Sequence, residues 1–182
     1  MQVAVLRRTG ALVARILAAA GDLDGDLTLE LIDLREERLP LCDGTPPDEL
    51  GAKAREVCER LRAADGFVIG TPVYRASFSA VLKNLLDLAP ADALAGRPAA
   101  IAVSGGSRDH FLVGDYALRP VLSAMGAHTL PTAIYADPDA ADGAAAERLE
   151  RAIAAAAAEL VAAVQSTANP GSERTRIGGG DV

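Results

Sequence analysis

The sequence is poor in several residue types whose absence narrows the possible functions. Aromatic residues make up 3% of the 182 residues and tryptophan is absent, so the core has to be built mainly from Leu, Val, Ile and Ala. Two cysteines and two histidines, far apart in the chain, form neither a metal-ligand pattern nor a disulfide framework. No apolar run is long enough to span a bilayer. The N-terminus lacks the charged-then-apolar pattern of a signal peptide, so we expect a cytoplasmic protein.

Basic residues are also fewer than acidic residues. The chain has 18 Lys and Arg against 25 Asp and Glu, a formal net charge of −7. Nucleic-acid binding requires a basic surface, so this balance argues against nucleic acid as a partner. A local basic spot such as Arg7 and Arg8 could still bind a small anion.

Half of the residues are hydrophobic, enough for the core of one globular domain. Apolar patterns typical of strands and of amphipathic helices alternate along the chain. The predicted strands span residues 2–6, 27–34, 66–70, 98–106 and 128–136, and the predicted helices span residues 11–21, 51–64, 78–89, 110–126 and 143–164. We expect Gly21 to end the first helix, and Pro131 to place the last strand at a sheet edge.

This alternation predicts an α/β fold. Short buried strands separated by helices form a parallel sheet with helices on both faces, a three-layer sandwich. Five strands fit the flavodoxin-like order 2-1-3-4-5. We assign residues 1–165 to this domain and expect residues 166–182, which are polar and glycine-rich, to be a disordered tail.

Ligands of open α/β sheets bind at the carboxyl ends of the strands, where the strand order reverses. Three loops should line that edge here: residues 7–10, 71–77 and 104–108. In "GTPVYRASFS" (70–79) a rigid turn carries Tyr74, a planar surface, and its backbone amides could meet the edge of a flat heterocycle. An ordinary turn with an exposed tyrosine is the alternative.

The loop "VSGGSRDH" (103–110) contains two adjacent glycines at a strand end, which let a ligand approach the backbone closely. Ser104 and Ser107 add hydroxyl groups. This loop alone is weak evidence, because helix entries use the same residues.

The segments "TPVYRASFSAVLKNLLDLAP" and "SGGSRDHFLVGDYALRPVLSAMGA" together resemble the NAD(P)H-dependent FMN reductases of the flavodoxin-like superfamily, over about residues 65–137. The chain looks most like the reductase component of two-component alkanesulfonate monooxygenase systems. The resemblance implies FMN and NAD(P)H as ligands, hydride transfer to the flavin, a flavin-dependent monooxygenase as recipient, and a homodimer or homotetramer. It places these residues against the flavin: Thr71, Pro72, Val73, Tyr74, Arg75, Ser77, Ser104, Gly105, Gly106 and Ser107.

The same resemblance implies that Tyr116, in "GDYALRPVL", lies in a π-bulge at an interface between subunits. Such bulges often mark functional sites. An ordinary helical tyrosine near Pro120 is the alternative interpretation.

The first loop departs from the family. The resembling reductases have a longer loop whose hydroxyls and amides hold the FMN phosphate, whereas this chain has only Arg7, Arg8 and Thr9 before the helix. Either these residues replace the lost hydroxyls, or the phosphate site is lost, or the arginines are merely solvated. Two other functions therefore stay open: a quinone or azo-type reductase that retains FMN, and a flavin-free homologue with a scaffold or recruited role.

Hydride transfer needs no protein acid or base, because the flavin performs the chemistry. We accordingly predict no catalytic side chain.

Overall fold

The computed structural model describes residues 1–7, 10–46, 49–137 and 143–168, and for residues 5–7 and 168 the backbone alone. The strands are β1 (Gln2–Arg7), β2 (Thr28–Asp33), β3 (Gly66–Pro72), β4 (Pro98–Ser104), β5 (His128–Thr129) and β6 (Ile134–Ala136). The α-helices are α1 (Gly10–Leu23), α2 (Ala52–Ala63), α3 (Ala80–Leu88), α4 (Arg119–Ala124) and α5 (Gly143–Ala168). A 3-10 turn, η2 (Arg108–His110), and a π-helical turn, η3 (Gly114–Leu118), precede α4.

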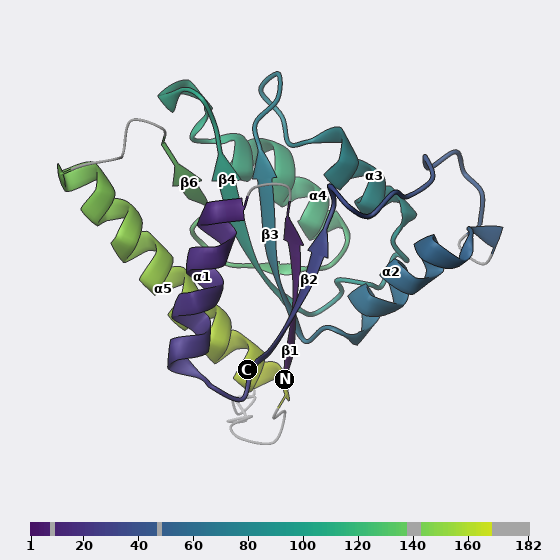
Figure 1. Cartoon of the computed structure of the whole chain (residues 1–182), viewed down its shortest axis with the longest axis horizontal. Helices are drawn as coiled ribbons and strands as arrows, with labels where there is room; N and C mark the ends of the chain where they lie inside the picture. Colours follow the sequence, from purple (N-terminus) through teal and green to yellow (C-terminus); the bar gives the residue numbers. More distant parts are fainter. Residues whose placement is uncertain (8–9, 47–48, 138–142, 169–182) are drawn as a thin grey trace, which may run out of the picture.

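The strands form one parallel sheet in the order β2-β1-β3-β4-β5, and β6 also pairs with β4. Helices cover both faces, with α1 and α5 on one face and α2, α3 and α4 on the other (Figure 1). The predicted fold class and strand order are therefore confirmed. All but the last residues of β3 and β4 are buried, as expected for central strands covered on both sides.

Each sheet face packs against its own apolar core. Phe67 and Ile101 face the helices α2, α3 and α4, while Val68 and Ala100 face α1 and α5. The small side chains Ala20 and Ala157 lie at the contact between α1 and α5, the two helices that pack side by side. Alanine thus lets helices approach closely in a chain with few aromatic residues.

The last predicted strand differs from the structure, because residues 128–136 form two short strands instead of one. The backbone N–H of Leu130 still bonds to the carbonyl of Ala99, but the ladder stops there and resumes at Ile134. Pro131, between them, has no N–H to donate. The sheet therefore has six strands rather than five, and β5 and β6 share the edge position beside β4.

Two of the predicted helices differ from the structure in a way that involves glycine or proline. Gly21 does not end α1, which continues to Leu23, because its φ is not in the left-handed region that ends helices. The helix predicted over residues 110–126 is interrupted, and Pro120 lies in the first turn of α4, where proline is tolerated.

Helix α5 extends three residues into the predicted tail, to Ala168, and residues 169–182 lie outside the described part of the chain. None of the helices in the described ranges has the length and apolarity needed to cross a membrane.

Candidate functional site

The loops after β3 and β4 lie side by side because these strands are neighbours in the sheet. Pro72 and Ser104 are register partners, and the backbone N–H of Val73 bonds to the carbonyl of Ser104 at 2.8 Å. On the other side, the end of β1 pairs Arg7 with Gly70. The sheet thus brings the loops after β3 and β4 and the end of β1 to one edge. Arg8 and Thr9 lie outside the described residues, and of Arg7 only the backbone is placed.

The turn after β3 is a tight two-residue hairpin. Tyr74 and Ser77 exchange backbone hydrogen bonds of 2.8 and 3.0 Å. Between them Arg75 and Ala76 have φ values of 50° and 59°, in the left-handed region that non-glycine residues rarely adopt. Tyr74 is 54% exposed at this turn. A strained backbone held in one conformation is common where a protein meets a ligand.

Tyr116 ties the π-helical turn to this hairpin. It is the middle residue of η3, at the position where the sequence predicts a π-bulge. Its hydroxyl donates a hydrogen bond of 2.8 Å to the carbonyl of Ala76. Gly114, the first residue of η3, leaves no room for a side chain, since a Cβ there would lie 2.8 Å from the Cβ of Ala133. The turn is therefore anchored on the sheet and holds the hairpin tip.

Thr71 has an internal role that the sequence did not indicate. It is fully buried, and its hydroxyl accepts a hydrogen bond of 3.0 Å from the backbone N–H of Ser79. Ser79 in turn caps α3 by accepting from the N–H of Leu82. Thr71 therefore joins the hairpin to α3, and its expected contact with the flavin stays a prediction.

The loop after β4 is also held from within. The Ser107 hydroxyl accepts from the N–H of Asp109 at 3.2 Å and thereby caps η2. Gly105 is needed because a Cβ there would lie 2.2 Å from the hydroxyl of Tyr135. Gly106 is exposed, and a Cβ there would meet nothing within 4 Å. Gly106 is thus the more open of the two glycines, and the contact of either one with a flavin stays a prediction.

The edge fits a flat heterocycle with hydrogen-bond acceptors along one side. It offers an exposed aromatic ring on Tyr74, and the backbone N–H of Gly106 makes no hydrogen bond to any of the described residues. Helix α1 begins at Gly10, two residues after β1, and its first turn carries no acidic residue. A helix start of this kind binds phosphate through its free N–H groups. The described residues include no cluster of metal-ligating side chains.

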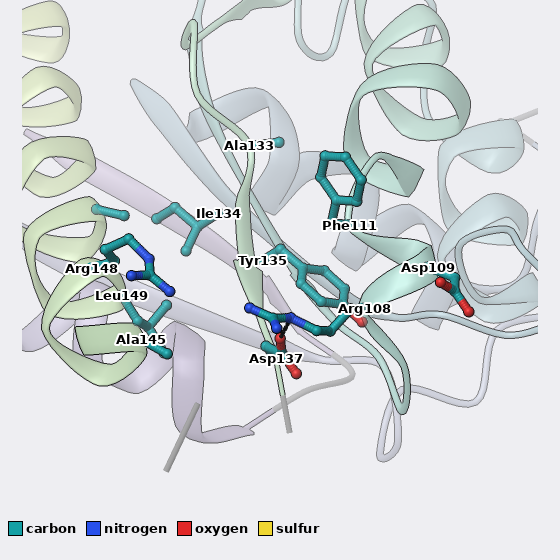
Figure 2. A pocket seen from close by; sticks show the side chains of 11 residues that line it. Arg108, Asp109, Phe111, Ala133, Ile134, Tyr135, Asp137, Ala145, Arg148 and Leu149 are labelled. Atoms are coloured by element: carbon teal, nitrogen blue, oxygen red, sulfur yellow. Dashed lines mark ion pairs between the residues drawn. The ribbon is translucent and has the colours of Figure 1, made fainter. Parts of the chain in front are cut away.

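A cavity of about 570 Å³ lies beyond the β4 loop, between β6 and α5 (Figure 2). It contains none of the residues predicted to bind the flavin. Its lining is formed by Arg108, Asp109, Phe111, Ala133, Ile134, Tyr135, Asp137, Ala145, Arg148, Leu149 and Ala152. We place the candidate flavin site at the strand ends rather than in this cavity, because Tyr74 and Gly106 lie at the strand ends and do not line the cavity. Sequence reasoning missed Tyr135, which contacts the β4 loop from here, because its strand pattern marks it only as a partly buried strand residue.

Comparison with known proteins decides the family. Residues 4–142 match the family model described as NADPH-dependent FMN reductase. The chain belongs to the NADPH-dependent FMN reductase family. The resemblance inferred from the two loop motifs is thereby confirmed.

Two relatives and one solved structure show how similar this chain is to other oxidoreductases. The NADH-dependent FMN reductase SfnF of Pseudomonas fluorescens (strain Pf0-1) is 38% identical over 138 residues, which are 74% of this chain and 72% of the relative. The NAD(P)H-dependent FAD/FMN reductase of Geobacillus thermodenitrificans (strain NG80-2) is 32% identical over 132 residues, 72% of this chain and 71% of the relative. A solved oxidoreductase of Corynebacterium diphtheriae is 31% identical, with a TM-score of 0.79 over 91% of this chain and 97% of its own.

Proposed function

We propose that this protein is an NAD(P)H:FMN oxidoreductase that delivers reduced flavin to a partner monooxygenase. The proposal is supported by one observation on this member of the FMN reductase family. Its residues 71–77 and 104–107 follow paired strands and lie together at the carboxyl edge of the sheet. Oxidation of NADH and of NADPH with added FMN tests it. The absence of FMN-dependent oxidation with either nucleotide contradicts it.

The protein residues bind and orient rather than react. When bound here, FMN would supply the acceptor for the hydride of reduced nicotinamide. Tyr74 presents its ring to one part of the flavin, and the N–H of Gly106 donates to the flavin edge. Ser77 and Ser104, partly buried beside them, complete the contact. Tyr116 keeps the hairpin in its strained conformation, so that this surface exists before the flavin arrives.

Further contacts proposed for the flavin come from the backbone of Pro72 and Val73 and from the Arg75 side chain. All three positions are partly buried or exposed at the edge. Gly105 and Ser107 support this surface through their own internal contacts. Hydride transfer then needs close stacking of the two rings, which a rigid surface favours.

The short first loop holds the phosphate in a different way. Arg7, Arg8 and Thr9, with the start of α1, supply guanidinium and amide donors in place of a row of hydroxyls. A clamp of few contacts suits a flavin that binds, is reduced and leaves for a monooxygenase. It does not suit the alternative of a permanently held flavin.

The phosphate clamp is tested by Arg8→Ala. We expect the KM for FMN to rise about tenfold, because a charge-assisted hydrogen bond contributes about 1.5 kcal/mol. The KM for riboflavin, which has no phosphate, should stay within twofold. Arg55→Ala, at an exposed position on α2, is the matched control. Equal losses for FMN and riboflavin, or no loss for either, would contradict the assignment.

A further inference from the structure

Tyr135 links the edge strand β6 to the loop after β4. Its register partner is Val103, and its ring packs against the core that α3 and α4 cover. From there its hydroxyl reaches the loop and donates a hydrogen bond to the carbonyl of Ser107. The phenol also occupies the space that Gly105 leaves free, with its hydroxyl 2.2 Å and its ring carbons 3.1 Å from a Cβ placed there.

A second link joins the same two segments. Arg108 and Asp137 form an ion pair, with the guanidinium Nε 2.8 Å from the carboxylate Oδ2 (Figure 2). The Asp137 side chain is 16% exposed, so this contact is partly shielded from solvent. The loop is thus fastened to the end of β6 at two successive residues, Ser107 and Arg108. Both fastenings lie directly after Gly106, the glycine that is open to a ligand.

The phenol of Tyr135 remains a hydrogen-bond donor over the working pH range. Burial and, secondarily, the charge of Asp137 raise the pKa of this phenol above its ordinary value, and the bond to Ser107 offsets this in part. A phenol with a raised pKa keeps its proton at neutral pH. Its hydroxyl can therefore donate to Ser107 at neutral pH.

We propose that Tyr135 is a positioning residue for flavin binding, which sets the conformation of residues 105–107 so that the Gly106 backbone faces the flavin. This inference rests on the proposed function. The residue touches no ligand itself. It acts by filling the space beside Gly105 and by holding the Ser107 carbonyl away from the flavin side.

Four variants test this: Tyr135→Phe, Gly105→Ala, the two combined, and Thr132→Ala, an exposed control on the same segment. FMN affinity is measured by quenching of flavin fluorescence, and KM and kcat by nucleotide oxidation. Tyr135→Phe removes one hydrogen bond, so we expect the Kd and KM for FMN to rise about fivefold. We expect kcat and the KM for the nucleotide to change less than twofold in Tyr135→Phe. In the control Thr132→Ala, the Kd and KM for FMN should also change less than twofold.

The double variant separates positioning from direct contact. A methyl group at Gly105 must displace the Tyr135 hydroxyl, so Gly105→Ala alone should weaken FMN binding more than Tyr135→Phe does. Removing the hydroxyl relieves the shortest of these contacts and leaves the ring carbons at 3.1 Å, so the combined variant should bind FMN more tightly than Gly105→Ala alone. If the combined variant binds as weakly as the two losses added together, the alanine collides with the flavin itself and the proposal is wrong.

Melting temperatures distinguish failure of this inference from failure of the proposed function. Without flavin, Gly105→Ala should lower the Tm, because the added methyl group clashes with Tyr135. The combined variant should have a higher Tm than Gly105→Ala alone. A wild-type protein that does not reduce FMN overturns the proposed function, whatever the melting temperatures are. A lowered Tm for Tyr135→Phe with unchanged FMN affinity overturns the inference, because the residue would then be structural only.

Discussion

Residues at the sheet edge divide into those whose side chains bond within the chain and those that remain exposed. Thr71 and Ser107 use their hydroxyls within the chain, one to join the hairpin to α3 and the other to cap η2. Tyr74 and Gly106 remain exposed. A motif match alone assigns all four to the flavin, and only their hydrogen bonds and burial separate the two groups.

Replacing Thr71 by valine tests the internal role of this residue. The change keeps the shape but removes the acceptor of the Ser79 N–H, which is then buried without a partner. We expect the free energy of unfolding to fall by about 2 kcal/mol, the cost of an unsatisfied buried donor. Urea denaturation measures this loss, and the Kd for FMN should change less than twofold. A large loss of FMN affinity with unchanged stability would instead show that Thr71 touches the flavin.

Ala76 tests the strain in the hairpin. Its φ of 59° costs an L-residue about 1–2 kcal/mol, which exceeds the roughly 0.5–1 kcal/mol that glycine loses in chain entropy. Ala76→Gly should therefore stabilise the protein by up to about 1 kcal/mol, whereas the β-branched Ala76→Val should destabilise it by more than that. Thermal unfolding of both variants measures the difference. Equal melting temperatures for the two would mean that the turn carries no strain.

At the scale of elements, an ion-pair cluster fastens the segment after β2 to α2. The carboxylate of Glu37 lies 2.7 Å from the Lys53 ammonium and 2.9 Å from the Arg60 guanidinium, and Arg60 also pairs with Glu30 on β2. The Glu37 side chain is only 12% exposed. Burial by itself raises the pKa of Glu37, but hydrogen bonds and charges from Lys53 and Arg60 lower it by more, so this pKa lies below its ordinary value.

A lowered pKa makes stability depend on pH in a defined direction. The contribution of Glu37 is complete above the unfolded-state pKa of about 4.3 and is lost as the pH falls through the folded-state value. Glu37→Gln should thus be less stable than wild type at neutral pH, by about 2 kcal/mol, and the difference should shrink on acidification. Denaturant unfolding over this pH range measures it. A difference that is constant with pH would contradict the cluster's role.

The elements themselves were predictable where hydrophobic period and length agree. Strands β1 to β4 and helix α5 follow from buried runs and from a long apolar stripe. The sequence does not predict the interruption at Pro131 or the internal contacts of Tyr135, because both depend on which segments become neighbours in three dimensions. The positions of the loops after β3 and β4 could be predicted, since parallel strands bring their carboxyl ends together. Which side chains bond within each loop depends on packing and could not.

At the scale of the whole molecule, exposed apolar side chains gather on the segment that contains the π-helical turn. Phe111 is 55% exposed, Leu112 47% and Tyr116 55%. Neighbouring apolar groups on a surface commonly mark a contact between proteins. The homodimer or homotetramer predicted from the sequence would use this segment as its contact, which would place subunits beside the hairpin that Tyr116 holds.

The oligomer is tested by Phe111→Ser combined with Leu112→Ser. Loss of two buried apolar side chains at a subunit contact weakens it by about 3 kcal/mol or more, so the assembly should dissociate. Size-exclusion chromatography with light scattering measures the mass. Leu41→Ser, at a residue 79% exposed elsewhere on the surface, should leave the mass unchanged. An unchanged mass for the double variant would place the contact on another face.

We propose that this chain reduces FMN as a substrate that enters and leaves the site. Steady-state oxidation of NADH and NADPH, measured at increasing FMN with the purified, desalted protein, tests it most directly. We expect little oxidation without added FMN, and a rate that rises with FMN to saturation with at least one nucleotide. Full activity of a yellow protein without added FMN would contradict a dissociating flavin. The absence of turnover at saturating FMN with both nucleotides would contradict the reductase itself.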